Sequence, residues 1–339
     1  MKALVTGATG FIGGNVVRAL LRHGYRVRAL VRDGRGSDAL AALGVELAVG
    51  DLCDETSLTA AVTGCEAVLH VGALYTLWAP RPELVYRTNV RGTRSLLEAA
   101  GRAGVERVVF TSSESTLEVP DGGLGSEAAA ADFNTVPGAY KRSKFLSEQV
   151  ALDMARSGLP VVVVNPTTPV GVGDVKPTPT GHIVLDFLNG RMPAYVDTGL
   201  NVVDVEDVAE GHVLALERGG VGERYVLGNE NLTLRALLER LAAVTGLRPP
   251  RVRLPHWLAL ALAHASEATA RGLGTGPPRV PLDGVRASGH YRYFDCTKAV
   301  RELGMPQTPL DEALLKAVSW FTDNGYVRRR LPGAREEAA

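Results

Sequence analysis

The 339-residue chain has few cysteines, no excess of either charge and no long apolar run. Its three cysteines, Cys53, Cys65 and Cys296, are an odd number without metal-type spacing, so we expect reduced, buried thiols rather than a disulfide framework. The histidines form no HxxxH or HxH cluster with them, and no metal site is expected. The 37 basic residues balance 37 acidic ones, which gives no reason to expect nucleic acid as a partner.

The chain also lacks recognisable membrane and export signals. Its most apolar later stretch, 254–265, is interrupted by Pro255, His256 and His264 and is too short to span a bilayer, so a buried or interfacial helix is expected there. The N-terminus starts with a strand-like segment, 2–6, without the charged-then-apolar pattern of a signal peptide. We therefore expect a cytoplasmic protein with no membrane span.

The first half of the chain alternates short β-rich runs with amphipathic helical segments. This alternation is typical of a parallel sheet covered on both faces. The expected strands are 2–6, 26–31, 46–49, 67–71, 107–111 and 161–165, and the expected helices are 11–23, 56–62, 81–103 and 139–157. The predicted fold class is α/β, with a Rossmann-type doubly wound parallel sheet.

After Pro166 the pattern is less regular, because proline and glycine clusters separate helical pieces. The expected elements are helices over 180–189, 205–218, 233–245, 257–271 and 310–324, and short strands at 202–203 and 225–227 that return to the main sheet. We expect a nucleotide-binding domain over 1–166, joined by parts of 200–228. A smaller, mostly helical substrate lobe over 167–327 and a frayed polar tail over 328–339 should follow.

The segment Thr-Gly-Ala-Thr-Gly-Phe-Ile-Gly, 6–13, lies between a predicted strand and a predicted helix. Its glycines allow a tight turn, close approach of backbone to a pyrophosphate, and close packing of helix on sheet. The helix N-terminus adds free N–H groups and the positive end of its dipole. A tightly packed turn is the alternative, but the flanking strand and helix favour nucleotide binding. The expected cofactor contacts here are Gly7, Thr9, Gly10, Phe11, Ile12 and Gly13.

The residues after the second and third strands bear on the choice of cofactor. Arg32 precedes Asp33, and an arginine there can pair with a 2′-phosphate whereas an acidic residue would hold the ribose 2′-OH. This order favours NADP(H) over NAD(H); the alternative is a solvated Arg32 with Asp33 on the 2′-OH. Asp51 and Leu52 are expected near the adenine, although Asp51 could equally be a helix N-cap.

Tyr140 and Lys144 are four residues apart on a predicted helix and therefore project from one face. A tyrosine, with an ordinary pKa of about 10, is a poor base near neutral pH unless a cation favours its phenolate. Lys144 can supply that charge and can donate to a cofactor ribose. A surface pair is the ordinary alternative, but the strand before it ends in hydroxyls, 111–113, that could hold a carbonyl or alcohol oxygen.

These motifs occur together in an order that resembles the extended short-chain dehydrogenase/reductase family over nearly the whole chain. The resemblance implies a Ser-Tyr-Lys site. In it, Ser113 orients the substrate oxygen, with Ser112 as the alternative, Tyr140 acts as acid or base, and Lys144 lowers the Tyr140 pKa.

The same resemblance implies further roles. Asn89 would support the active-site helix, and Asn165 and Pro166 would contact the cofactor. A homodimer would form through the helices expected over 81–103 and 139–157. A structural role is expected for His70, at the end of the fourth strand.

Within the family, the chain resembles the hopanoid-associated sugar epimerase group, which is itself similar to dihydroflavonol 4-reductase. The segments that carry this likeness are 176–181, 191–201 and 207–212. Glu114 and Asp204 depart from the pattern, which commonly has a small residue and a histidine at these places. The candidate substrate contacts are Thr178, Tyr195 and Asn201, together with Arg191 and Arg292, although each could be an ordinary packing or surface residue. The proline-containing segment 177–180 could be a rigid substrate loop, since prolines lower the flexibility of a chain that must hold a ligand. It could equally begin a helix, with Thr180 as its N-cap, and the two roles are compatible.

The sequence therefore predicts an NADP(H)-dependent oxidoreductase that interconverts a carbonyl and a secondary alcohol, with Tyr140 handling the proton. The main alternative is a sugar-nucleotide epimerase with a retained NAD(P). A third is a nucleotide-sensing protein without turnover. Arg32 favours the reductase, because an epimerase regenerates its cofactor and has no need of the NADPH pool.

Overall fold

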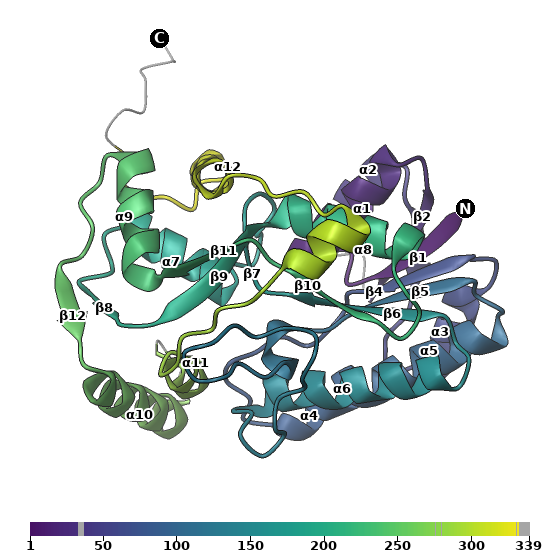
Figure 1. Ribbon diagram of the computed structural model, residues 1–339, viewed down its shortest axis with the longest axis horizontal. Helices are drawn as coiled ribbons and strands as arrows, with labels where there is room; N and C mark the ends of the chain where they lie inside the picture. Colours follow the sequence, from purple (N-terminus) through teal and green to yellow (C-terminus); the bar gives the residue numbers. More distant parts are fainter. Residues whose placement is uncertain (33–36, 275, 279, 330, 332–339) are drawn as a thin grey trace, which may run out of the picture.

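The computed structural model describes the whole chain except residues 33–36, 275, 279, 330 and 332–339. Asp33 and most of the predicted tail 328–339 therefore lie outside the described residues. At the centre is a seven-stranded parallel sheet in the order β10-β6-β5-β4-β1-β2-β3, covered by helices on both faces (Figure 1). Its strands are β1 (Lys2–Thr6), β2 (Arg26–Val31), β3 (Glu46–Val49), β4 (Ala67–His70), β5 (Arg107–Thr111), β6 (Val161–Pro166) and β10 (Arg224–Leu227). The predicted doubly wound α/β fold is confirmed.

The central strands form because they are continuous apolar runs that can be buried on both sides. All six residues of β6, for example, are buried. One face packs against α1 (Phe11–Arg22) and α8 (Val205–Arg218). The other packs against α3 (Glu55–Val62), α5 (Gly92–Arg102) and α6 (Ala139–Arg156). A short helix, α2 (Ser37–Ala42), lies between β2 and β3.

The helix expected over 81–103 is interrupted. It consists of α4 (Pro82–Tyr86), a π-helical turn, η1 (Arg87–Arg91), and α5. The reason lies at Asn89, whose carbonyl oxygen accepts hydrogen bonds from the hydroxyls of Thr93, at 2.5 Å, and Ser147, at 2.8 Å. These side chains compete with the backbone N–H for that carbonyl, and the turn widens, as π-turns at functional sites often do.

The second half of the chain builds a separate layer at one end of the sheet (Figure 1). Two small sheets combine β7 (Thr168–Val170), β9 (Gly199–Asp204) and β11 (Glu230–Thr233), and β8 (Ala194–Val196) with β12 (Val252–Leu254). The helices are α7 (Pro179–Leu188), α9 (Leu234–Thr245), α10 (His256–Leu273), α11 (Leu282–Ala287) and α12 (Leu310–Asp323). The π-helical turn η3 (Ala299–Leu303) instead packs with α8 in the core of the main sheet. Residues 225–227 return to the main sheet in β10, as predicted, whereas 202–203 do not, because β9 pairs with β7 and β11.

The exposure of the cysteines, the character of the helices and the free edge of the main sheet also bear on the predictions. Cys65 and Cys296 are buried, but Cys53 is exposed, so the expectation of three buried thiols is wrong for Cys53. No helix among the described residues combines the length and apolar character needed to cross a membrane. The edge of β10 is covered by a loop, in which the Glu127 carboxylate accepts the N–H of Val226 at 2.7 Å.

Candidate active site

The glycine loop between β1 and α1 has the geometry of a dinucleotide cradle. Gly7 has a φ of 70°, which glycine adopts without strain. A Cβ on Gly13 would collide with the carbonyl of Gly7, so only glycine lets helix and loop approach this closely. Gly10 caps α1 without a side-chain hydrogen bond, which leaves the N–H groups of the first turn open toward a phosphate.

The residues predicted to hold the adenosine end lie at the same edge of the sheet, because β1, β2 and β3 are parallel. Arg32 is exposed directly after β2. Asp51 is half-buried, and its Oδ1 accepts the N–H of Cys53 at 2.8 Å. The N-cap of α3 is Asp54, which accepts the N–H of Thr56, so the alternative role of Asp51 as N-cap is wrong. Leu52 is partly buried and packs against the core cluster on the sheet face covered by α3, α5 and α6.

Lys144 is brought to the carboxyl end of β5. It is buried, its Nζ donates to the carbonyl oxygen of Thr111 at 2.6 Å, and the same atom lies 4.6 Å from the ring centroid of Phe110. Burial lowers the pKa of Lys144 to about 8, against the opposing charge of the Glu148 carboxylate. The amine can therefore change its charge close to neutral pH.

Tyr140 lies one helical turn before Lys144, at the start of α6, and is half-buried. Its ring meets that of Tyr75 edge-on, with 4.5 Å between the centroids. Burial raises the pKa of Tyr140 above its ordinary value, and Tyr75 and the negative charge of Glu114 raise it further. The resemblance implied a lowered pKa, but here the Lys144 ammonium donates to Thr111. Tyr140 thus keeps its proton near neutral pH and can act as an acid.

Ser113 follows β5 and caps a short 3₁₀ turn, η2 (Glu114–Thr116). Its hydroxyl donates to Oε2 of Glu114 at 2.6 Å and lies 3.0 Å from the hydroxyl of Ser115. Arg292 holds Glu114 from the other side, with its Nε 3.4 Å from Oε1 and its Nη2 donating to the Glu114 carbonyl at 3.0 Å. The departure at Glu114 therefore places a carboxylate directly against the serine predicted to be catalytic.

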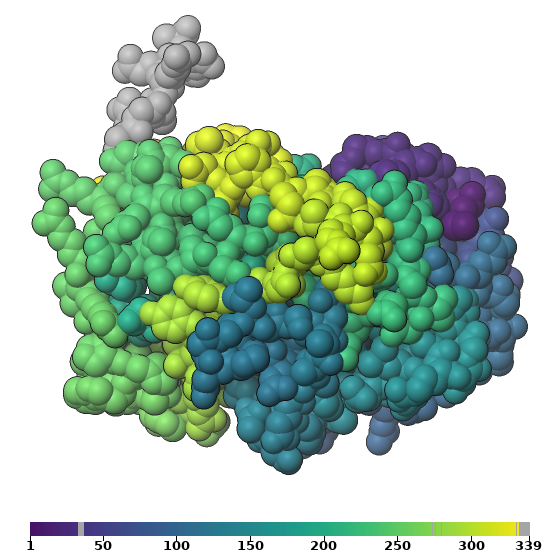
Figure 2. All heavy atoms as spheres, viewed as in Figure 1, coloured from purple at the N-terminus to yellow at the C-terminus, as the bar shows by residue number. Residues whose placement is uncertain are grey.

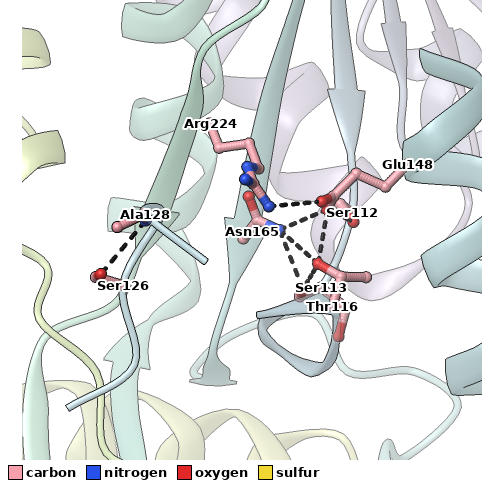
Figure 3. A network of polar contacts seen from close by, with 8 residues as sticks. All are labelled: Ser112, Ser113, Thr116, Ser126, Ala128, Glu148, Asn165 and Arg224. Atoms are coloured by element: carbon pink, nitrogen blue, oxygen red, sulfur yellow. Dashed lines mark hydrogen bonds and ion pairs between the residues drawn. The ribbon is translucent and has the colours of Figure 1, made fainter. Parts of the chain in front are cut away.

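Ser113 and the η2 turn that it caps are together called the serine turn. Behind it, the buried carboxylate of Glu148 accepts hydrogen bonds from several donors (Figure 3). Its Oε2 accepts from the hydroxyl of Ser112, from that of Thr116 at 2.6 Å and from Nδ2 of Asn165 at 2.8 Å. Its Oε1 lies 3.4 Å from Nη1 of Arg224. Ser112 is thus buried and directed to Glu148, whereas Ser113 is partly exposed, and this arrangement favours Ser113 over the alternative.

Asn165 lies beneath the serine turn. Besides Glu148, its Nδ2 donates to the carbonyl of Ser113 at 3.1 Å and to Thr116 Oγ1 at 3.0 Å. Its Oδ1 is buried and has no hydrogen-bond partner among the described residues. Pro166 follows it, also buried. Asn165 therefore positions Ser113, and the contact of both residues with a cofactor stays a prediction.

A second series of hydrogen bonds connects β1, the strand before the glycine loop, to α6. The His70 ring bonds Thr6 through Nδ1 at 2.8 Å and Thr93 through Nε2 at 2.9 Å. Thr93 donates to the Asn89 carbonyl, and Asn89 Nδ2 donates to the Ser143 hydroxyl at 2.8 Å. Burial, with the charge of Lys144, lowers the pKa of His70 to about 3, so the ring is neutral and structural.

The candidate substrate residues are largely engaged by the protein itself. Thr178 is the N-cap of α7, accepting the N–H of Gly181 at 3.1 Å, and it donates to Asp174 at 2.9 Å, so Thr180 is not the cap. Asn201 is buried, and its side-chain amide has several hydrogen-bond partners, including the Thr167 hydroxyl at 2.8 Å and groups of Asn229 and Asn231.

Tyr195 and Asp204 are likewise engaged in contacts within the protein. Tyr195 is half-buried in β8 and packs against the core of the second layer. Asp204 is the N-cap of α8, accepting the N–H of Glu206 at 2.8 Å, and lies 2.9 Å from the Lys316 ammonium. A capping and ion-pairing role thus accounts for the acidic residue at this position.

Sequence patterns did not predict two features of the candidate site. These are the hydrogen-bond network around Glu148 and the contact of Glu114 with Arg292. Glu148 does carry a signal, because it continues the spacing of Tyr140 and Lys144 by one more helical turn. No comparable signal connects Glu114 with Arg292. Among the residues that the structure describes, no group of three or more His, Cys, Asp or Glu side chains could hold a metal ion.

Residues 3–228 match the NAD dependent epimerase/dehydratase family. The chain belongs to this family. Over 329 residues it is 48% identical to a protein of Synechocystis named "Putative dihydroflavonol 4-reductase", covering 96% of this chain and 95% of that one. It is 36% identical to sterol demethylase protein B of Methylococcus capsulatus over 330 residues, 96% of this chain and 100% of the relative.

Solved structures give the same family. A nucleoside-diphosphate-sugar epimerase from Pseudomonas aeruginosa superposes with a TM-score of 0.78 at 30% identity, covering 97% of this chain and 99% of that one. The chain is an NAD(P)-dependent enzyme of this extended short-chain dehydrogenase/reductase type.

Proposed function

We propose that the enzyme is an NADP(H)-dependent oxidoreductase that interconverts a carbonyl group and a secondary alcohol, in the manner of dihydroflavonol 4-reductase. The observation that carries the proposal is geometric: Tyr140 and Lys144 lie one turn apart on α6, and Lys144 reaches the carboxyl end of β5, which Ser113 follows. A phenol that keeps its proton suits reduction, in which a carbonyl oxygen must be protonated as it becomes an alcohol.

The other site residues fit this direction. The Ser113 hydroxyl can hydrogen bond the substrate oxygen and orient it toward Tyr140, once it exchanges its present acceptor on Glu114. Lys144 lies one turn along the same helix, and its positive charge favours the phenolate that remains after proton transfer. A bound nicotinamide dinucleotide would supply the hydride.

The glycine loop and Arg32 support NADP(H) as that cofactor. The open first turn of α1 and the close contact at Gly13 fit a dinucleotide phosphate. Arg32 is exposed at the end of β2, where a guanidinium can pair with a 2′-phosphate in a bidentate geometry. The likeness to the Synechocystis relative, at 48% identity, supports a reductase.

The test is Tyr140→Phe, assayed over a panel of dihydroflavonols, steroid ketones and other hydrophobic carbonyl compounds. The variant should bind NADPH as the wild type does, but its turnover rate should fall by a factor of about 10² to 10⁴, the usual contribution of a general acid. Arg156→Met, at an exposed position at the other end of α6, is the control for the helix and should leave turnover unchanged. Unchanged turnover in Tyr140→Phe would defeat the mechanism.

A sugar-nucleotide epimerase is the second candidate, and the superposition with the Pseudomonas epimerase favours it. Such an enzyme removes a hydride and returns it, so it retains its cofactor. It should convert UDP- or dTDP-sugars without added reductant, whereas the reductase should require NADPH and leave these sugars unchanged. A protein that binds NADPH but turns over neither class would be a nucleotide sensor.

A further inference from the structure

Up to Thr269, the exposed face of helix α10 (His256–Leu273) carries no fixed charge. Trp257 is 69% exposed and Leu262 is 50% exposed. The exposed residues between His256 and Thr269 are Trp257, Ala261, Leu262, His264, Ala265, Ala268 and Thr269. A helix face that meets water normally carries charged side chains, and exposed large apolar residues that gather on one element mark an interaction surface.

The opposite face of α10 attaches it to the rest of the molecule. Ala259, Ala263 and Ala270 are buried, and the carboxylate of Glu267 accepts the N–H of Leu282 in α11 at 3.1 Å. The helix lies at the far end of the second layer, away from the seven-stranded sheet, and forms the lower left edge of the molecule (Figures 1 and 2). The exposed face is thus presented on a firmly attached helix.

The exposed charged residues of the segment 248–272, which contains most of α10, are all arginines. Exposed arginines precede it at 248, 251 and 253, and Arg271 follows in its last turn. Arg253 pairs with Asp197 at 2.7 Å and Arg271 with Glu267 at 3.0 Å, whereas Arg248 and Arg251 make no ion pair in the described part of the chain. The only acidic residue over 248–272 is Glu267, which is buried. Val252, 59% exposed between two of the arginines, adds to the apolar surface.

We propose that α10 and the arginine segment before it, 248–253, form a docking surface for a bilayer that contains anionic lipid. The helix lies in the plane of the membrane, with Trp257 and Leu262 in the boundary between headgroups and acyl chains. Apolar burial of this kind combined with basic residues is the pattern of interfacial helices, and tryptophan favours that depth. Arg248 and Arg251 pair with lipid phosphates.

The charge pattern selects lipid over a second copy of the chain. A two-fold interface would place this surface against itself, so that Arg248 and Arg251 of both copies would converge, and the segment 248–272 offers no exposed acidic residue to receive them. An anionic bilayer supplies the missing negative charge.

Docking would also bring the candidate active site near the membrane. The Asp283 side chain of α11 packs against Gly138, where an added Cβ would collide with its carboxylate. Gly138 caps α6, and Tyr140 follows two residues later. Helix α11 therefore links the docking surface to the start of the helix that carries Tyr140.

Co-sedimentation of the full chain with vesicles tests this proposal. Vesicles of equal parts phosphatidylglycerol and phosphatidylcholine should bind the wild type, and pure phosphatidylcholine vesicles should bind it much more weakly. Trp257→Ser with Leu262→Ser, and separately Arg248→Glu with Arg251→Glu, should each weaken binding at least about ten-fold. Leu315→Ser, at a 46% exposed leucine of α12, and Arg94→Glu, at an exposed arginine of α5, are the matched controls and should bind as the wild type does.

A conservative variant keeps the test valid if a polar substitution disturbs folding. Trp257→Phe should retain vesicle binding but lose most of the fluorescence quenching that brominated lipid produces in the wild type. Equal binding to neutral and anionic vesicles, or quenching that persists in Trp257→Phe, would overturn the proposal. The proposal would also be overturned if the protein formed a concentration-dependent dimer that bound no vesicles, and if Trp257→Ser with Leu262→Ser abolished that dimer. None of these readouts requires turnover, so they are independent of the proposed reaction.

Discussion

The Ser113 hydroxyl donates a 2.6 Å hydrogen bond to the carboxylate of the next residue, Glu114. That carboxylate also contributes to the raised pKa of Tyr140 and is held in place by Arg292. One side chain, at a position where a small residue is common in similar sequences, thus acts on two of the three predicted catalytic residues.

Glu114→Gln should move the pH dependence of the reaction. Removing the negative charge lowers the pKa of Tyr140, because the phenolate is then less disfavoured. Reduction needs the protonated phenol, so the alkaline limb of the kcat/KM profile should shift to lower pH. The profile is measured with NADPH and any active carbonyl substrate, and Glu118→Gln, at an exposed site on the same segment, serves as control. A shift to higher pH, or the same shift in both variants, would refute this role.

Lys144→Met should change how stability depends on pH. The pKa of Lys144 is lowered by burial from 10.5 to about 8. Below about pH 8 the amine is charged in both the folded and unfolded states, and its burial opposes folding. Between about pH 8 and 10.5 the folded state loses the proton first, so the wild type should become more stable as the pH rises.

Lys144→Met lacks this contribution. The free energy of unfolding of the wild type, relative to Lys144→Met, should therefore increase by about 3 kcal/mol from pH 7.5 to 10.5, from the size of the pKa difference. Urea unfolding at the two pH values measures it, with Lys176→Met, at an exposed lysine, as control. A difference that stays constant with pH contradicts the lowered pKa.

Glu148→Ala should destabilise the fold strongly. It removes the acceptor shared by Ser112, Thr116 and Asn165 and leaves Arg224 without its ion-pair partner. Loss of one member of a buried charge pair typically costs about 3–5 kcal/mol. Glu148→Gln keeps an acceptor and should lose less. The free energy of unfolding in urea is the measurement, and Gln149→Ala on the same helix should change it little. If Glu148→Ala were as stable as Gln149→Ala, the network would not support the serine turn.

Arg32→Ala should weaken NADPH binding about ten- to a hundred-fold, since it removes charge-assisted hydrogen bonds to the 2′-phosphate. NADH binding should change little. Arg26→Ala, at the exposed opposite end of β2, should leave both affinities unchanged. Calorimetric titration of each nucleotide distinguishes the outcomes, and equal losses for NADPH and NADH in Arg32→Ala would defeat the assignment.

The sequence predicted the main sheet well because its strands are local signals. The first six strands are apolar runs between helical segments, and their observed bounds agree with the expected ones to within one residue. The sheet membership of 202–203 could not be found in this way, because β9 is placed by its pairing with β7 and β11. Likewise, the π-turn at Asn89 depends on the hydroxyl of Ser147, 58 residues later.

The same limit applies to the candidate site. Gly7, Tyr140 and Lys144 belong to compact motifs and could be named from spacing alone. The supporting contacts join distant segments: Arg224 is 76 residues from Glu148, and Arg292 is 178 residues from Glu114. The raised pKa of Tyr140 is also a property of burial, which the spacing of Tyr140 and Lys144 does not contain.

The central claim is that the enzyme exchanges NADP(H) and reduces a carbonyl group. The most direct measurement is to denature the purified protein, identify any released nucleotide by chromatography with its stoichiometry, and titrate the freed site with NADPH and NADH. We predict little retained nucleotide and a clear preference for NADPH. Near-stoichiometric NAD released from the protein would contradict this account and indicate an epimerase.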